Sequence, residues 1–284
     1  MDLILHIGTP KTGTTSIQGL LAKNRALLAD RGVLVPKCFE RRAMHEIAMA
    51  FRAPGWPNNE FAQGLGWGRE EDRAPWQAAF RDRLSDELAR SGAKTVIISS
   101  EFLVSRFMVA EEPAALAAWL RPRFDRITVL VYLRDPVRTF VSRMSTGLKV
   151  GDVVAMPAPG PVASARAWRA ACINSLQGDA MRGDLAGDGP IYHWLDYGTV
   201  LEMWSDAFGR DAVVPVAFHR DHLEGGDAVT DFLARAGLDA DGLTRHADRN
   251  ATLSVEAAAV LMALNRAFPA FEEAQDPDAA AAPV

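Results

Sequence analysis

The sequence of 284 residues has only two cysteines, Cys38 and Cys172, and little excess charge of either sign. Two cysteines do not form a disulfide framework, so we interpret them as buried or incidental thiols and expect a reducing, cytoplasmic setting. A formal net charge of -5 argues against general nucleic-acid binding. Apolar runs stay short of the ~18 residues of a membrane span, and no basic and apolar leader precedes the first apolar run, so we expect a soluble protein without integral membrane association.

Short apolar runs alternate with stretches of helical periodicity, which is typical of a parallel sheet with crossover helices. Apolar residues recur every four positions from Trp76 to Leu88 and predict an amphipathic helix that Gly92 would end. We expect residues 1–271 to form a single α/β domain and residues 272–284, which are poor in bulky apolar side chains, to be a disordered tail. The predicted strands are residues 3–7, 33–35, 95–99, 127–133 and 213–218.

The most informative stretch is residues 3–18, LILHIGTPKTGTTSIQ, in which an apolar strand runs into a Gly/Thr-rich loop that opens a helix. The amides of such a loop and the positive end of the helix bind phosphate groups. The spacing resembles the nucleotide-binding P-loop G-x-x-x-x-G-K-[ST], with Gly8 and Gly13 as the two glycines and Thr15 as the hydroxyl residue. Thr14 stands where an NTPase keeps its lysine, and Lys11 lies three residues earlier. We therefore expect a nucleotide without a γ-phosphate.

A second element, ITVLVYLRDPVRTFVSRM at residues 127–144, ends an apolar strand at Arg134. Asp135 and Pro136 predict the N-cap and first residue of a helix, and Ser142 follows eight residues after Arg134. The loop PKTGTTS and this second element together resemble the sulfotransferases that use 3′-phosphoadenosine 5′-phosphosulfate (PAPS), and more closely the prokaryotic carbohydrate-type enzymes. In that family the loop binds the 5′-phosphosulfate, and the arginine and serine of the second element help to bind the 3′-phosphate.

The resemblance implies a P-loop-like three-layer α/β fold with a five-stranded, mainly parallel sheet in the order 2-3-1-4-5. It also implies transfer of a sulfuryl group from PAPS to a hydroxyl of an acceptor, expected to be a small molecule or glycan and above all a carbohydrate. The product would be 3′-phosphoadenosine 5′-phosphate (PAP), and no metal is expected. Lys11 would stabilise negative charge on the leaving phosphate. The residues expected to bind the donor are Lys11, Thr12, Gly13, Thr14, Thr15, Ser16, Arg134 and Ser142.

The acceptor hydroxyl needs a general base, and two residues are candidates. Glu101 follows the third predicted strand, at the edge where open α/β sheets bind ligands. His45 is the rival because histidine titrates near neutral pH. His6, inside the first strand, is expected to be a buried, hydrogen-bonded residue. Two Gly/Pro-rich segments, residues 54–75 and 151–161, are interpreted either as surface connections or as irregular loops that bind the acceptor.

Two other functions fit parts of the pattern. In a P-loop NTPase or small-molecule kinase, Asp135 could hold Mg²⁺ as a Walker B carboxylate. Pro136 directly after it and the threonine at position 14 argue against that hypothesis. A catalytically inactive nucleotide-binding module is the third hypothesis, and the joint presence of Lys11, Arg134 and Ser142 argues against it.

Overall fold

The computed structural model describes residues 1–53, 70–149, 151, 193–245 and 253–267. It divides into two compact units, one made of Met1–Arg134 and Ala180–Ala247 and the other of Asp135–Asp179 and Asp248–Val284. The expected tail at residues 272–284 and Cys172 lie outside the described residues. Each unit is therefore presented by itself.

The first unit contains a five-stranded sheet in the order β2-β3-β1-β4-β5, with every neighbouring pair parallel. This confirms the predicted fold class and strand order. In the central pairings, Leu5 of β1 lies opposite Ile98 of β3 and Val129 of β4. The strands are β1 (Asp2–His6), β2 (Val33–Leu34), β3 (Thr95–Ser99), β4 (Arg126–Leu133) and β5 (Val213–Ala217).

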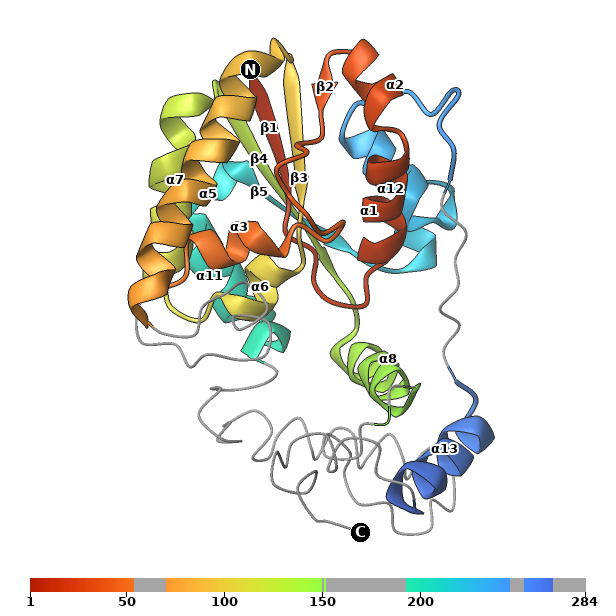
Figure 1. Ribbon diagram of the computed structural model, residues 1–284. Helices are drawn as coiled ribbons and strands as arrows, with labels where there is room; N and C mark the ends of the chain where they lie inside the picture. The colour runs from red at the N-terminus through yellow and green to blue at the C-terminus, as the bar shows by residue number, and fades with distance from the viewer. Residues whose placement is uncertain (54–69, 150, 152–192, 246–252, 268–284) are drawn as a thin grey trace, which may run out of the picture. The chain divides into compact units, whose positions relative to one another are not determined.

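Helices cover both faces of this sheet, as Figure 1 shows, with α1 and α12 on one side and α5, α7 and α11 on the other. A parallel sheet covered on both faces is built from continuous apolar runs, which explains why its central strands lack a polar alternation. The helices of this unit are α1 (Thr14–Lys23), α2 (Arg25–Asp30), α3 (His45–Ala50), α5 (Glu70–Ser91), α6 (Phe102–Arg106), α7 (Glu111–Leu120), α11 (Tyr197–Phe208) and α12 (Ala228–Arg235). Its short 3-10 turns are η1 (Arg121–Arg123), η2 (His193–Leu195), η3 (Arg210–Ala212), η4 (Arg220–His222) and η5 (Glu224–Gly226).

Helix α5 starts earlier than the sequence pattern indicated. Residues 70–75 were expected to belong to an irregular segment, and this expectation is wrong because they form the first turns of α5, with Pro75 inside the helix. A proline lacks the amide that would bond the carbonyl four residues earlier. In α5 that carbonyl belongs to the first turn, so the helix loses only one hydrogen bond near its start. The remainder of that segment, residues 54–69, and residues 152–161 of the other lie outside the described residues.

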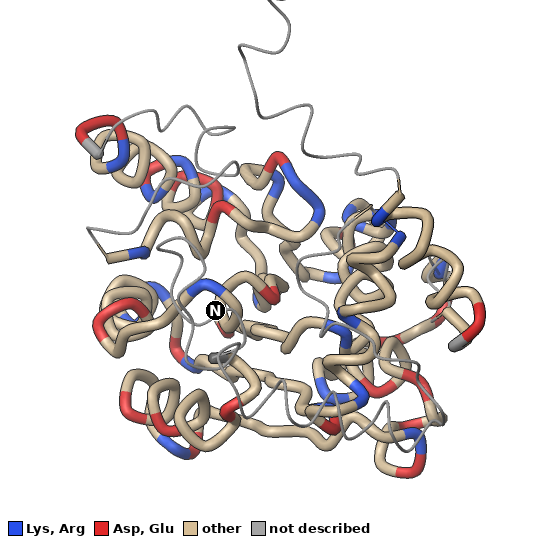
Figure 2. Tube along the Cα trace, turned by 90° about the horizontal axis from the view of Figure 1, so that it is seen from below, with Lys and Arg blue, Asp and Glu red and all other residues tan. Residues whose placement is uncertain are grey.

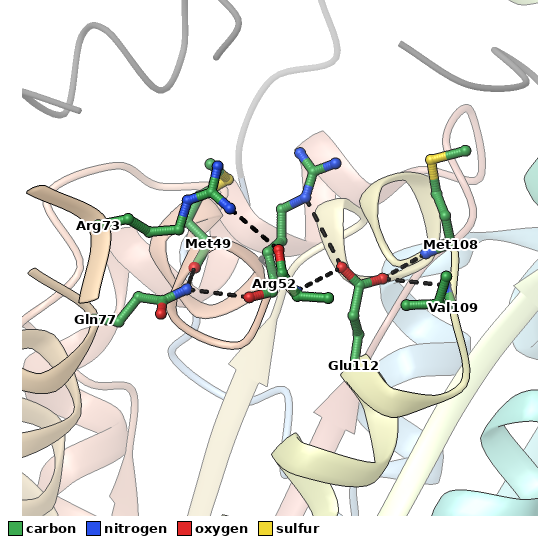
Figure 3. Close-up of polar contacts among 8 residues, drawn as sticks. Met49, Arg52, Arg73, Gln77, Met108, Val109 and Glu112 are labelled. Atoms are coloured by element: carbon green, nitrogen blue, oxygen red, sulfur yellow. Dashed lines mark hydrogen bonds and ion pairs between the residues drawn. The ribbon is translucent and has the colours of Figure 1, made fainter. Parts of the chain in front are cut away.

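A buried carboxylate, Glu112 on α7, connects three parts of the first unit (Figure 3). It accepts hydrogen bonds from the backbone amides of Ala53 (3.1 Å) and Met108 (2.6 Å). Its Oε1 also lies 3.9 Å from Nε of Arg52. On α5, Arg73 donates a hydrogen bond from Nη1 to the carbonyl of Ala53 at 3.1 Å. The backbone of Ala53 is thus held on its amide side by α7 and on its carbonyl side by α5.

The second unit has two described helices, α8 (Pro136–Lys149) and α13 (Val255–Ala267). The predicted N-cap of α8 is confirmed, because the carboxylate of Asp135 accepts a hydrogen bond from the amide of Arg138 at 2.8 Å. On α13, the side-chain amide of Asn265 donates to a backbone carbonyl of α8 at 2.9 Å.

Charge is mixed along the described helices, and Figure 2 shows Lys and Arg interspersed with Asp and Glu. Among the described residues, no helix has the length and apolar character needed to cross a membrane. Recognition of an anionic ligand would then depend on individual side chains in defined places and not on a broad field from the net charge.

Candidate functional site

The loop between β1 and α1 takes its shape from three residues in the left-handed region: Gly8 (φ 68), Lys11 (φ 70) and Gly13 (φ 78). The two glycines are needed for close packing as well as for this backbone conformation. A Cβ atom on Gly8 would lie 2.9 Å from Cβ of Glu101, and one on Gly13 would lie 2.7 Å from Cβ of Ala228. The two glycines of the motif therefore let the loop pack closely against Glu101, just after β3, on one side and against the first residue of α12 on the other.

Hydrogen bonds from buried side chains fix the backbone of this loop. Thr12 donates from Oγ1 to the carbonyl of Thr9 at 2.6 Å, and Thr9 donates from Oγ1 to the carbonyl of Tyr132 on β4 at 2.8 Å. Lys11 adopts its left-handed conformation between these two threonines, at a cost that a residue other than glycine normally avoids. The hydroxyl of Thr12, one of the expected donor-binding groups, is thus used within the loop.

Helix α1 begins at Thr14 directly after the loop, and its N-cap Gly13 has no side chain to bond the first-turn amides. The amides of Ser16 and Ile17 bond the carbonyl of Gly13 at 3.0 and 3.1 Å. Thr14 is buried and Thr15 is exposed. The helix therefore presents its positive end at the loop without a capping side chain, an arrangement suited to an anion.

Arg134 joins the second motif to the first. It follows β4, the parallel neighbour of β1, and donates a hydrogen bond from Nη1 to the carbonyl of Lys11 at 2.9 Å. Its guanidinium carbon lies 5.8 Å from the centre of the Phe218 ring. The hydroxyl of Tyr197 donates to the carbonyl of Arg134 at 2.5 Å. Sequence reasoning missed Tyr197 and Phe218, because no motif surrounds either residue.

Glu101 lies at the carboxyl end of β3, in the N-cap position of α6, and contacts the loop through Gly8. Its Oε2 accepts a hydrogen bond from Nε2 of Gln18 on α1 at 2.5 Å. Burial raises the pKa of Glu101, while the Gln18 bond and the nearby Thr14 and Lys11 act in the opposite direction. The structure therefore brings Glu101 to the same loop as Lys11. Sequence reasoning missed Gln18.

His45, the other candidate base, is the first residue of α3, and its ring lies against that of Phe102, with centroids 3.6 Å apart and the ring planes tilted by 33°. Burial lowers the pKa of His45 to about 4, and the positive charges of Arg41 and Arg106 act in the same direction. His45 is therefore neutral at pH 7. Phe102 directly follows Glu101, so both candidate bases belong to the region where α3 meets α6.

The remaining predicted positions are placed as follows. His6 is fully buried, its Nδ1 lies 2.8 Å from Oγ of Ser99, and burial lowers its pKa to about 3, as expected of a core histidine. Cys38 is partly buried. Ser142 belongs to α8 of the second unit, and its role at a nucleotide stays a prediction. Within the described ranges, no group of three His, Cys, Asp or Glu side chains could hold a metal ion.

Comparisons with known proteins give a structural match. No protein-family model matches the chain, and no curated protein sequence matches it. The chain is similar to a sulfotransferase structure. That crystal structure, of a sulfotransferase from Alicyclobacillus acidocaldarius, is 17% identical in sequence, with 94% of this chain and 92% of that chain covered and a TM-score of 0.49. The fold assignment of this chain comes from its own strand order and parallel pairings.

Proposed function

We propose that this chain is a PAPS-dependent sulfotransferase whose acceptor is a hydroxyl of a small molecule or glycan, with a carbohydrate as the first choice. The observation that carries the proposal is the hydrogen bond from Arg134 to the carbonyl of Lys11. It couples the residue expected at the 3′-phosphate to the lysine expected at the 5′-phosphosulfate. A lysine inside the loop, with threonine at the start of α1, suits a donor that has no γ-phosphate.

The donor would be bound by the amides of residues 12–15 around the start of α1, by the hydroxyl of Ser16, and by Lys11 and Arg134, with Ser142 as a further predicted contact. In the transfer, the bond from sulfur to the donor phosphate oxygen breaks while a bond to the acceptor oxygen forms. The ammonium group of Lys11 would stabilise the charge that develops on the phosphate. The acceptor proton would pass to Glu101, whose raised pKa brings it closer to the range in which a general base works best. His45 remains the alternative base.

The competing NTPase or kinase hypothesis requires Asp135 as a metal ligand. An oxygen of that carboxylate already accepts the amide of Arg138 as the N-cap of α8, which is a sufficient structural role for the residue. This supports the sulfotransferase proposal over the NTPase. The cytoplasmic setting, the single domain over residues 1–271 and the absence of a metal requirement remain predictions.

The test is a calorimetric titration of the protein with PAP and with ADP. We expect PAP to bind far more tightly, because ADP lacks the 3′-phosphate. Charge-assisted hydrogen bonds contribute about 1.5 to 3 kcal/mol, so Arg134→Ala should weaken PAP at least about tenfold. ADP should be weakened less than PAP, because it loses only the loop contact of Arg134 and has no 3′-phosphate for the guanidinium to bind.

Tyr197→Phe is the matched control, because it removes the bond to the Arg134 carbonyl and keeps the guanidinium. It should weaken PAP and ADP to a similar, small extent. Equal affinities of the wild-type protein for PAP and ADP would contradict the proposed donor. If Arg134→Ala lost affinity for PAP and ADP equally, Arg134 would only support the loop and would not bind the 3′-phosphate.

A further inference from the structure

The side chain of Gln18 is buried on α1, 2% exposed, and lies between two acceptors. Its Nε2 is 2.5 Å from Oε2 of Glu101 and 3.3 Å from the carbonyl oxygen of Ser99. A backbone carbonyl can only accept a hydrogen bond, so the nitrogen of the amide and not its oxygen must face this side. One amide group thus joins the helix behind the loop to the end of β3 and to the candidate base.

We propose that Gln18 is a positioning residue that holds the Glu101 carboxylate in one orientation beside the loop and keeps it in the ionised form that a general base requires. The base role of Glu101 rests on the proposed function, whereas the contact with Gln18 does not. A hydrogen bond donated to a carboxylate favours its charged form, and in a buried place water does not readily replace a lost donor. Loss of the Gln18 amide should therefore favour protonated Glu101.

Several other groups face Glu101 or the elements that pack on it. Thr14 on α1 and Lys11 in the loop also lower the pKa of Glu101, but less than Gln18 does, against the dominant effect of burial. Helix α3, which packs on α6, carries His45 and Glu46, and α6 itself ends in Arg106. Gln18 differs from the charged members of this set because it is neutral. Its removal changes the hydrogen bonding of Glu101 without removing a charge.

The test replaces Gln18 with methionine, which is of similar length and has no amide donor. The pKa of Glu101 should rise when it loses a hydrogen bond to its charged form, by about one to two pH units for a bond of this kind. A base acts only when deprotonated, so the acidic limb of kcat/KM should move to higher pH by the same amount. At a pH on that limb, kcat/KM should fall about tenfold for each pH unit that the limb moves, while PAP affinity stays at the wild-type value.

The Glu101 titration is read directly from the carboxyl ¹³C NMR signal of the ligand-free protein, assigned with Glu101→Gln. This readout needs no acceptor and no activity. Asn24→Leu is the matched control, because Asn24 is a second buried amide at the end of the same helix and bonds the carbonyls of Leu20 and Thr244. Asn24→Leu should leave the pKa of Glu101 at its wild-type value.

If Gln18→Met does not fold, Gln18→Glu provides the second variant. Two carboxyl groups at this distance titrate as a coupled pair, and the upper step should lie above the wild-type pKa of Glu101. An unchanged Glu101 titration in a folded variant overturns the proposal for Gln18. A shifted titration with an unmoved pH profile of kcat/KM instead removes Glu101 as the base, which is a failure of the proposed function.

Discussion

The left-handed backbone of Lys11 predicts that glycine at this position should give a more stable fold than alanine, while both variants lose sulfuryl transfer. At φ 70 a residue with a Cβ atom carries a cost of about 1 to 2 kcal/mol that glycine does not. Glycine loses about 0.5 to 1 kcal/mol in backbone entropy on folding relative to alanine. The free energy of unfolding of Lys11→Gly should therefore exceed that of Lys11→Ala by about 0.5 to 1 kcal/mol.

The comparison between the two variants isolates the backbone, because both lose the same ammonium group and every contact that it makes. Urea and thermal unfolding measure the difference, and for a chain of this size it corresponds to a rise of about 1 to 4 °C in Tm. Both variants should lose kcat by far more than they lose PAP affinity, since the ammonium acts on charge that develops during transfer. Lys11→Gly should thus be more stable than Lys11→Ala, although both variants lose activity.

Asp82, an exposed residue inside α5, gives the internal standard. There the order should reverse, with the glycine variant less stable than the alanine variant by about 1 kcal/mol. If Asp82 behaves in this way and Lys11→Gly is no more stable than Lys11→Ala, the backbone at Lys11 carries no strain and the reasoning fails.

Two further predictions concern the chemistry. Glu101→Gln should lower kcat by about 10² to 10⁴ and remove the acidic limb of kcat/KM. His45→Ala should keep that limb, because His45, with a pKa of about 4, is already deprotonated across the neutral range. Near wild-type turnover in Glu101→Gln with a collapse in His45→Ala would transfer the base role to His45. Activity should survive EDTA, since Lys11 supplies the positive charge at the leaving phosphate, and complete loss that Mg²⁺ restores would favour the NTPase.

The apolar runs predicted all five strands, because a buried parallel strand is a continuous run of apolar residues in the sequence. Strand β3 agrees with its prediction at both ends, while β2 is limited to Val33–Leu34, the only two of its residues that pair with β3. The length of β2 is set by its pairing with β3, and a hydropathy pattern does not show which residues pair. The start of α5 was missed for a related reason, because Pro75 and the neighbouring glycines dominate the local pattern.

Long-range contacts mark the limit of prediction for the candidate site. The carboxyl ends of β1, β3 and β4 share one edge of the sheet, so motifs at those ends could be expected to meet. Gln18 and Glu101 are separated by 83 residues, and Tyr197 and Arg134 by 63. Neither Gln18 nor Tyr197 belongs to a motif with a known spacing. Their contribution depends on how the helices pack, which requires the folded chain.

The anchoring of Ala53 makes residues 54–69 a natural unit for protein engineering. One end of this segment is held by Glu112 through the amide of Ala53, and Arg73, just beyond the other end, bonds the carbonyl of the same residue (Figure 3). The two side chains that hold Ala53 thus lie outside residues 54–69. For a flexible loop in general, doubling the length costs only about 0.6 kcal/mol in closure entropy. A change in length or composition between Ala53 and α5 would therefore keep both contacts that hold Ala53.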